Sequence, residues 1–319
     1  MQGKYSFWIK VLSCLLAGLA ITSYLIPSGD RGEDWIPLLS GFFDFAVISG
    51  RPVLSGILGG VFNALIAASL LAINTKSVNN VLNPALSVIF FLVIAYLHPG
   101  AAYFSPIHVA VLLLVWSQNC FIIGQKFTSM FLMSSAALFY APLMWGVPLV
   151  LIISVIGAGD MARVAVKSLG GIVLPLLYVL CFRYMVYADA LVFIDEYIEQ
   201  MFTFSSPLKS ITFTSLYLIG CVGVTALHAI SYMFSKLYKN SIATEHILKM
   251  EFMTLLMGAV LFFMYWGESN VPMNLIVAVP LAMLYTHYFT GKINAAAARV
   301  ELILLCSAAV ISRLSYFLT

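Results

Sequence analysis

Six charged side chains in this sequence could act together on an anionic substrate if the fold brought them to one face. Glu33 and Asp34 are neighbours, and a deprotonated carboxylate there could act as a general base on a hydroxyl group or coordinate a divalent cation that bridges a diphosphate. Arginine holds phosphate groups bidentately and stays charged when it is partly desolvated. The candidate substrate-binding residues are Arg31, Arg51, Arg183 and Arg313.

The composition limits the kind of fold that can position these residues. The chain has 319 residues, of which 62% are hydrophobic and 9% are charged, whereas a soluble domain carries about 25% charged residues. Apolar runs recur from residue 8 to the C-terminus and leave no room for a soluble domain of ordinary size. We therefore expect one integral membrane domain over residues 1–319. The net charge of +3 is spread over short loops, which argues against nucleic acid binding.

Charged residues and Pro-, Gly- and Asn-rich breaks divide the chain into candidate membrane-spanning helices. Runs of about 20 apolar residues are long enough to cross the hydrocarbon layer. The candidates cover residues 8–27, 53–73, 82–97, 106–123, 127–157, 170–187, 211–234, 252–267, 272–290 and 296–317.

The run 127–157 is too long for one span, because a single helix of that length would measure about 46 Å. Pro142, Gly146 and Pro148 interrupt it and predict a turn between two short helices. With the N-terminus inside, two crossings place most lysines and arginines on the inner side, as the positive-inside rule requires. The inner side then holds Lys4, Lys10, Lys76, Lys126, Arg163, Lys167, Lys236, Lys239, Lys249, Lys292 and Arg299, and the outer loops hold Arg31, Arg51 and Lys209.

The predicted architecture is thus an all-α polytopic bundle with about eleven transmembrane helices in a bacterial inner membrane. The N-terminus is expected to be cytoplasmic. Arg183 and Arg313 then lie at outer helix ends, on the same side as Glu33 and Asp34.

Two longer outer segments, residues 28–52 and 188–210, mix acidic with apolar residues and predict amphipathic helices on the outer surface. In the second segment the apolar residues at helical spacing are Leu191, Ile194, Tyr197, Ile198 and Met201. The alternative is that both segments are structural caps over the bundle.

The charged candidates also have structural interpretations. Arg183 could extend from its helix end to the interface, and the outer arginines could pair with outer carboxylates. Acidic outer loops are expected whenever positive residues are kept inside.

The cysteines and histidines do not predict a metal site. The five cysteines lie in apolar runs without a CxxC pair. Only His228 lies well within a span, and an intrahelical or interhelical hydrogen bond accounts for it. Asn63, Gln118 and Asn119 are polar residues within spans, where such residues hold helices together more often than they line a pathway. A transporter would use them together with His228.

Three stretches resemble a family of uncharacterised multi-pass membrane proteins from Bacteroidetes. They are SPIHVAVLLLVWSQNCF (105–121), SSAALFYAPLMWGVPLVLIISVI and GDMARVAVKSLGGIVLPLLYVLCFRYM (159–185). Members of that family are sometimes labelled carotene monooxygenases. A membrane iron enzyme needs several histidines at one depth, and the histidines of this chain lie on opposite sides of the membrane, so we do not transfer that label.

A more distant resemblance is to polytopic glycosyltransferases that use polyprenyl-phosphate sugars. Those enzymes are similar in having an acidic extracytoplasmic loop after the first span, an amphipathic outer helix and short central helices. The resemblance implies that Asp34 or Glu33 is the base or metal ligand and that the outer arginines hold the lipid phosphate. This chain lacks a soluble outer domain, which leaves the recognition of an acceptor unexplained.

The leading functional hypothesis is that the outer face handles a lipid-linked anionic substrate of the polyprenyl-phosphate type, by glycosyl transfer. The membrane lipid and a lipid-linked glycan are then the expected partners. The alternatives are a transporter or flippase, and a non-catalytic membrane subunit of an envelope complex.

Overall fold

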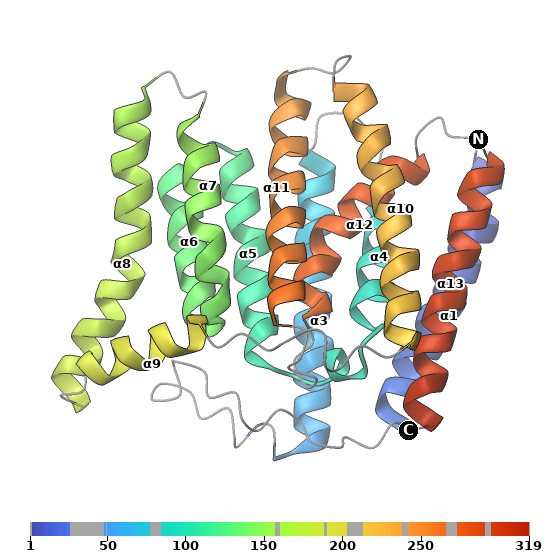
Figure 1. Cartoon of the computed structure of the whole chain (residues 1–319), viewed down its shortest axis with the longest axis horizontal. Helices are drawn as coiled ribbons and strands as arrows, with labels where there is room; N and C mark the ends of the chain where they lie inside the picture. Colours follow the sequence, from blue (N-terminus) through green and yellow to red (C-terminus); the bar gives the residue numbers. More distant parts are fainter. Residues whose placement is uncertain are drawn as a thin grey trace.

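A computed structural model describes residues 2–25, 48, 50–76, 84–156, 160–187, 190–202, 213–237, 242–265, 273–290 and 295–318 (Figure 1). In these ranges the chain forms α-helices and two short 3-10 helices, and no strand. The predicted all-α class is therefore confirmed. Arg31, Glu33 and Asp34 lie outside the described residues, as does most of the first predicted amphipathic segment, 28–52.

The helices lie on the predicted apolar runs, and most ends shift by a few residues, but two of them begin at Met161 and Ile242, well before the predicted starts at 170 and 252. They are α1 (Gln2–Leu25), α3 (Pro52–Lys76), α4 (Pro84–Ala95), α5 (Pro106–Ile122), α6 (Lys126–Phe139), α7 (Gly146–Val155), α8 (Met161–Tyr187), α9 (Ala190–Phe202), α10 (Phe213–Leu237), α11 (Ile242–Met264), α12 (Asn274–Thr290) and α13 (Ala295–Leu318), with the 3-10 helices η1 (Pro99–Ala102) and η2 (Ala141–Trp145).

All of these α-helices except α9 run alongside one another and alternate in direction along the chain, and α9 lies across one end of the bundle (Figure 1). We call this end, which also carries η1 and η2, the α9 end. The N-terminus of α1 lies at the opposite end (Figure 1). The alternation places the end of α8, the start of α3 and the end of α13 at the α9 end.

The apolar run 127–157 forms two helices, as predicted. Helix α6 ends at Phe139, η2 makes the turn, and α7 begins at Gly146. Pro142 lies in the first turn of η2, where its missing backbone donor is not needed. A Cβ atom on Gly146 would lie 1.8 Å from Met257 Sδ, so a residue without a side chain lets α11 pack directly against the turn.

Among the described residues, three helical segments are long and apolar enough to cross a membrane, namely Pro52–Ile73, Met161–Tyr187 and Leu216–Ser235. Other helices of the described chain are apolar but shorter, so the number of eleven spans stays a prediction. Large apolar side chains are exposed along these helices, for example Leu177 and Tyr178 on α8 and Leu227 on α10. Apolar surface of this extent indicates contact with a lipid phase.

Side chains from neighbouring helices donate hydrogen bonds to the carbonyl groups at the end of the short helix α4. Its 12 residues measure about 18 Å, and the carbonyl groups of its last turn have no partner within the helix. Asn274 Nδ2 of α12 donates hydrogen bonds to the carbonyl oxygens of Ile94, at 2.7 Å, and Ala95, at 2.5 Å. Arg313 Nη2 of α13 donates to the carbonyl oxygen of Tyr96. These bonds let α4 end inside the bundle.

Close packing of α6 against α8 depends on one of two adjacent glycines. A Cβ atom on Gly171 would lie 2.5 Å from the carbonyl oxygen of Phe127, whereas one on Gly170 would meet only the Phe127 ring, at 3.6 Å. In the same contact, Ser134 Oγ donates a 2.8 Å hydrogen bond to the carbonyl oxygen of Ile172.

These two glycines give a matched pair of variants. Gly171→Ala should destabilise the protein by about 1–3 kcal/mol, because the new methyl group pushes two helix backbones apart. Gly170→Ala should have no effect or should stabilise by up to about 1 kcal/mol, since alanine favours helix. The midpoint of thermal unfolding in detergent measures both. Equal midpoints for the two variants would contradict the packing described here.

Candidate functional site

Helix α9 is amphipathic and lies against the α9 end with one face. Phe193 and Tyr197, one turn apart, are buried against Leu138 and Val179 of α6 and α8. The acidic residues Asp195, Glu196 and Glu199 are exposed on another face. The sequence predicts this amphipathic helix correctly. Of the apolar residues at helical spacing, Tyr197 and Met201 pack against the bundle, whereas the others are exposed. The exposed ones are Leu191, Ile194 and Ile198.

The exposed apolar residues have a physical role of their own. On a helical wheel they lie between the buried stripe and the acidic stripe, so α9 presents one face to the bundle, one to an apolar phase and one to water. A helix with these three faces is typical of a membrane interface.

Hydrogen bonds fix the last turn of α9. Trp145 Nε1, at the end of η2, donates to the carbonyl oxygen of Met201 at 3.1 Å, and Tyr265 Oη donates to the same oxygen at 2.5 Å. The Trp145 and Phe202 rings meet edge to face with centroids 5.3 Å apart. Side chains from the hairpin turn and from the end of α11 thus hold α9 in place, because both donate hydrogen bonds to the Met201 carbonyl oxygen at the end of α9.

Arg183 lies about one turn before the end of α8, where α8 meets α9. Its guanidinium carbon is 5.3 Å from the centroid of the Phe193 ring and 5.7 Å from that of Tyr187, which are cation–π contacts. The neighbouring Tyr184 and Met185 are exposed. A guanidinium group is therefore positioned at the junction between the exposed apolar side of α8 and the amphipathic helix.

Arg313 has a different environment, because it is buried to 5% exposure between α13, α1 and α4. Besides the Tyr96 carbonyl oxygen, its Nη2 atom donates to Ser23 Oγ at 2.6 Å and to the carbonyl oxygen of Leu19 at 3.3 Å. A cation at the C-terminal end of a helix also interacts favourably with the helix dipole. Arg313 connects three helices in this structure.

The structure does not bring the predicted arginines into one cluster. Helices α8 and α13, which carry Arg183 and Arg313, lie at opposite sides of the bundle (Figure 1). Arg51 is exposed just before α3. Arg31, Glu33 and Asp34 are outside the described residues, so their predicted roles stay predictions.

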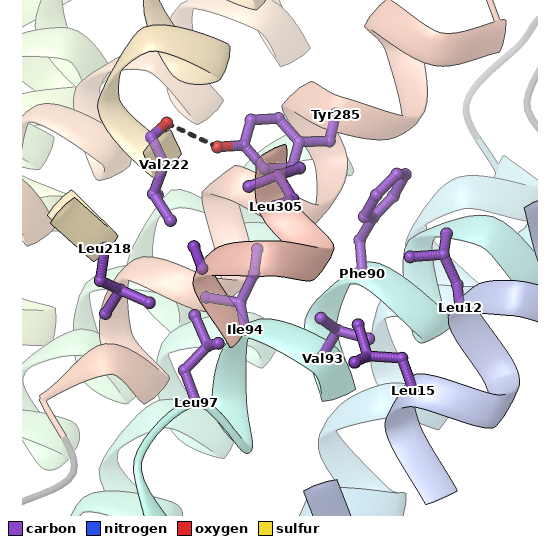
Figure 2. Close-up of a pocket in the computed structure, with 11 residues that line it drawn as sticks. Leu12, Leu15, Phe90, Val93, Ile94, Leu97, Leu218, Val222, Tyr285 and Leu305 are labelled. Carbon is purple, nitrogen blue, oxygen red and sulfur yellow. Dashed lines mark hydrogen bonds between the residues drawn. The ribbon is translucent and has the colours of Figure 1, made fainter. Parts of the chain in front are cut away.

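A small apolar cavity lies between α1, α4, α10, α12 and α13 (Figure 2). Its volume is about 10 Å³, far below the several hundred Å³ of a small-molecule site. Tyr285 Oη, the polar group drawn beside it, donates a 2.8 Å hydrogen bond to the carbonyl oxygen of Val222. The cavity is a packing defect and has no means of holding a substrate. Its lining residues are Leu12, Leu15, Phe90, Val93, Ile94, Leu97, Leu218, Val222, Tyr285, Leu305 and Ala308.

Two of the polar residues proposed for a transport path, Asn63 and Gln118, hold helices together. Asn63 Nδ2 donates to the carbonyl oxygen of Ala101 at 2.8 Å, next to a bond between that oxygen and His108 Nε2 at 3.1 Å. Gln118 Nε2 donates to Thr254 Oγ1 of α11 at 3.1 Å. These contacts agree with the structural alternative for polar residues in spans.

Two buried carboxylates that the sequence analysis did not select as candidates pair with histidines. Glu301 Oε1 of α13 lies 2.6 Å from His228 Nδ1 of α10 and accepts a 3.1 Å hydrogen bond from Tyr288 Oη of α12. Glu251 Oε2 of α11 lies 3.8 Å from His287 Nε2 of α12. For His228 the sequence predicts an intrahelical or interhelical hydrogen bond; the structure shows an interhelical one, and its partner was not predicted. An acidic residue within an apolar run is the signal that could have found both carboxylates.

No family model, no curated protein and no solved structure matches the chain. Within the part of the chain that the structure describes, no group of three or more His, Cys, Asp or Glu side chains could hold a metal ion. In the residues that it describes, the structure is all-helical, with three long apolar helices and an amphipathic helix across one end.

Two arginines on α13 test the structural role of Arg313. Arg313→Ala should lower the free energy of unfolding by about 1.5–3 kcal/mol, because it removes charge-assisted hydrogen bonds to buried groups of α1 and α4. Arg299→Ala, an exposed position on the same helix, should change it by less than about 0.5 kcal/mol. Thermal unfolding in detergent provides the measurement. An unfolding midpoint for Arg313→Ala equal to that of the unaltered protein would show that the network does not stabilise the bundle.

Proposed function

We propose that the chain crosses a bacterial inner membrane eleven times, with the N-terminus in the cytoplasm and the α9 end outside. The helices too short to cross by length alone end inside the bundle, where side chains such as Asn274 and Arg313 satisfy their last carbonyl groups. Lys126, Arg163 and Lys167 lie at the starts of α6 and α8, at the end opposite α9. The positive-inside rule then makes that end cytoplasmic.

At the outer face the protein binds a lipid-linked anionic substrate of the polyprenyl-phosphate type. The observation that carries this proposal is the position of Arg183. The guanidinium group lies at the outer end of an exposed apolar helix face, beside the interfacial helix α9. A polyprenyl chain that follows the exposed residues of α8 would bring its phosphate to the level of this group, where an arginine binds phosphate well.

The reaction proposed is glycosyl transfer from that lipid phosphate. Glu33 and Asp34, in the outer segment after α1, would supply the general base or the ligands of a divalent cation. This assignment rests on the resemblance to polytopic glycosyltransferases. Arg31 and Arg51 remain further candidates for holding the phosphate, whereas Arg313 takes no part in this proposal, because it is engaged between helices.

Transport is a second candidate function, and one observation favours it. The pair formed by His228 and Glu301 places a titratable carboxylate inside the bundle, and such residues are frequent in proton-coupled transporters. Asn63 and Gln118 do not support a path, since their side-chain donors bind neighbouring helices.

Two arginines of α8 provide a matched test of the lipid site. In nanodiscs, Arg183→Ala should reduce the binding of undecaprenyl phosphate at least about tenfold, which corresponds to the loss of one phosphate contact of about 1.4 kcal/mol. Arg163→Ala, on the same helix at the other end, should leave binding unchanged. Native mass spectrometry measures the bound lipid, and the uncharged polyprenol serves as the control for the apolar contribution.

Equal lipid binding by both variants would overturn the proposed site. Asp34→Asn separates binding from chemistry, because it should retain undecaprenyl phosphate but lose transfer of a labelled sugar from a polyprenyl-phosphate sugar. Full transfer by Asp34→Asn and by Glu33→Gln would remove both carboxylates from the mechanism. A partner that co-purifies in stoichiometric amount, with no lipid bound, would favour the non-catalytic subunit.

A further inference from the structure

The pair of His228 and Glu301 joins a group at the surface of the bundle to a buried one. The His228 side chain is 59% exposed on α10, whereas the Glu301 side chain is 6% exposed. Glu301 lies about two turns from the start of α13, within an apolar segment. A carboxylate at this depth is costly unless it is paired or protonated, and it commonly marks a functional site.

The contacts of Glu301 allow a proton to reside either on His228 Nδ1 or on Glu301 Oε1. Oε1 lies 2.6 Å from His228 Nδ1 and accepts a hydrogen bond from Tyr288 Oη. Oε2 is buried and has no hydrogen-bond partner among the described residues. The pair has no net charge either as imidazolium with carboxylate or as imidazole with carboxylic acid. At this separation the proton can pass between the two atoms without movement of either helix.

We propose that His228 and Glu301, with Tyr288, form a proton-binding site near the end of the bundle opposite α9. A proton that binds at the exposed His228 is transferred to Glu301: the Nδ1–H bond breaks, the Oε1–H bond forms, and the imidazolium becomes a neutral imidazole as the carboxylate becomes an acid. The site does not depend on the lipid substrate proposed above.

The surroundings of Glu301 support this assignment. From α12 it is faced by Tyr288 and by Tyr285, which lies close enough to interact with it electrostatically, but Tyr285 Oη already donates to the Val222 carbonyl oxygen (Figure 2). On α10, the Tyr232 ring contacts the ring of Tyr288 at 5.7 Å. Arg299 of α13 and Lys10 of α1 are exposed. Among the described residues, His228 is a basic group that contacts Glu301 directly.

A second histidine–carboxylate pair also involves α12. His287, next to Tyr288 in the chain, faces Glu251 of α11, whose two oxygens have no hydrogen-bond partner in the described part of the chain. The separation of 3.8 Å between Nε2 and Oε2 is too long for a hydrogen bond. Two consecutive residues of α12, His287 and Tyr288, therefore face the two buried carboxylates, Glu251 and Glu301 respectively.

Infrared difference spectroscopy of the full-length protein in a lipid film tests the proposal directly. A pH step from mildly alkaline to mildly acidic buffer should give rise to a carboxylic acid C=O band of a buried group. Glu301→Gln should abolish this band, Tyr288→Phe should shift it, and Glu199→Gln, an exposed residue of α9, should leave it in place.

An unchanged band in Glu301→Gln would overturn the proposal, as would the absence of any buried carboxyl band in the unaltered protein. Because Glu301→Gln could also weaken packing, His228→Gln provides an independent variant. It keeps a side chain that can hydrogen-bond but cannot be protonated, so it should alter the pH at which the band appears. A band with the same pH dependence in His228→Gln would show that the histidine does not supply the proton.

Discussion

The fold depends on hydrogen bonds between buried polar side chains and the carbonyl groups of neighbouring helices, above all at helix ends. Inside an apolar phase a helix end cannot bind water, so its last carbonyl groups need donors from the protein. Asn274 and Arg313 supply them for α4, and Trp145 and Tyr265 supply them for α9. These bonds allow short helices to end within the bundle and allow an amphipathic helix to lie across it.

The same constraint accounts for several polar residues that looked like candidates for a site. The donors of Arg313, Asn63 and Gln118 bind other helices. Arg183 differs in its position, because it contacts aromatic rings at the edge of an exposed apolar surface. Glu301 differs because one of its oxygens meets a histidine at the surface of the bundle. The two proposals for this protein, a lipid phosphate site and a proton site, rest on these two exceptions and lie at opposite ends of the bundle.

The sequence predicts the elements well and their contacts poorly. Apolar run length and loop charge were sufficient for the all-α class, for the turn between α6 and α7 and for an amphipathic α9, since each is a local property. Which apolar residues of α9 face the bundle could not be predicted, because this helix has apolar residues both on the side that meets the bundle and on an exposed side. The roles of Arg313 and Glu301 could not be predicted, because each depends on which helices are neighbours in space. The predicted roles of Arg31, Glu33 and Asp34 stay predictions, because these residues lie outside the part of the chain that the structure describes.

The central claim is that the chain alternates across a membrane with the α9 end outside, and a cysteine labelling map tests it most directly. Single cysteines at the exposed positions Arg51 and Glu199, at the α9 end, and Gln125 and Asp160, at the opposite end, would replace the native residues in a chain without its own five cysteines. In intact cells, an impermeant thiol reagent should label positions 51 and 199, and should label 125 and 160 only after permeabilisation. Labelling of positions 125 and 160 alone would show that the orientation is the reverse of the one proposed. Labelling of two positions from opposite ends would contradict the alternation itself.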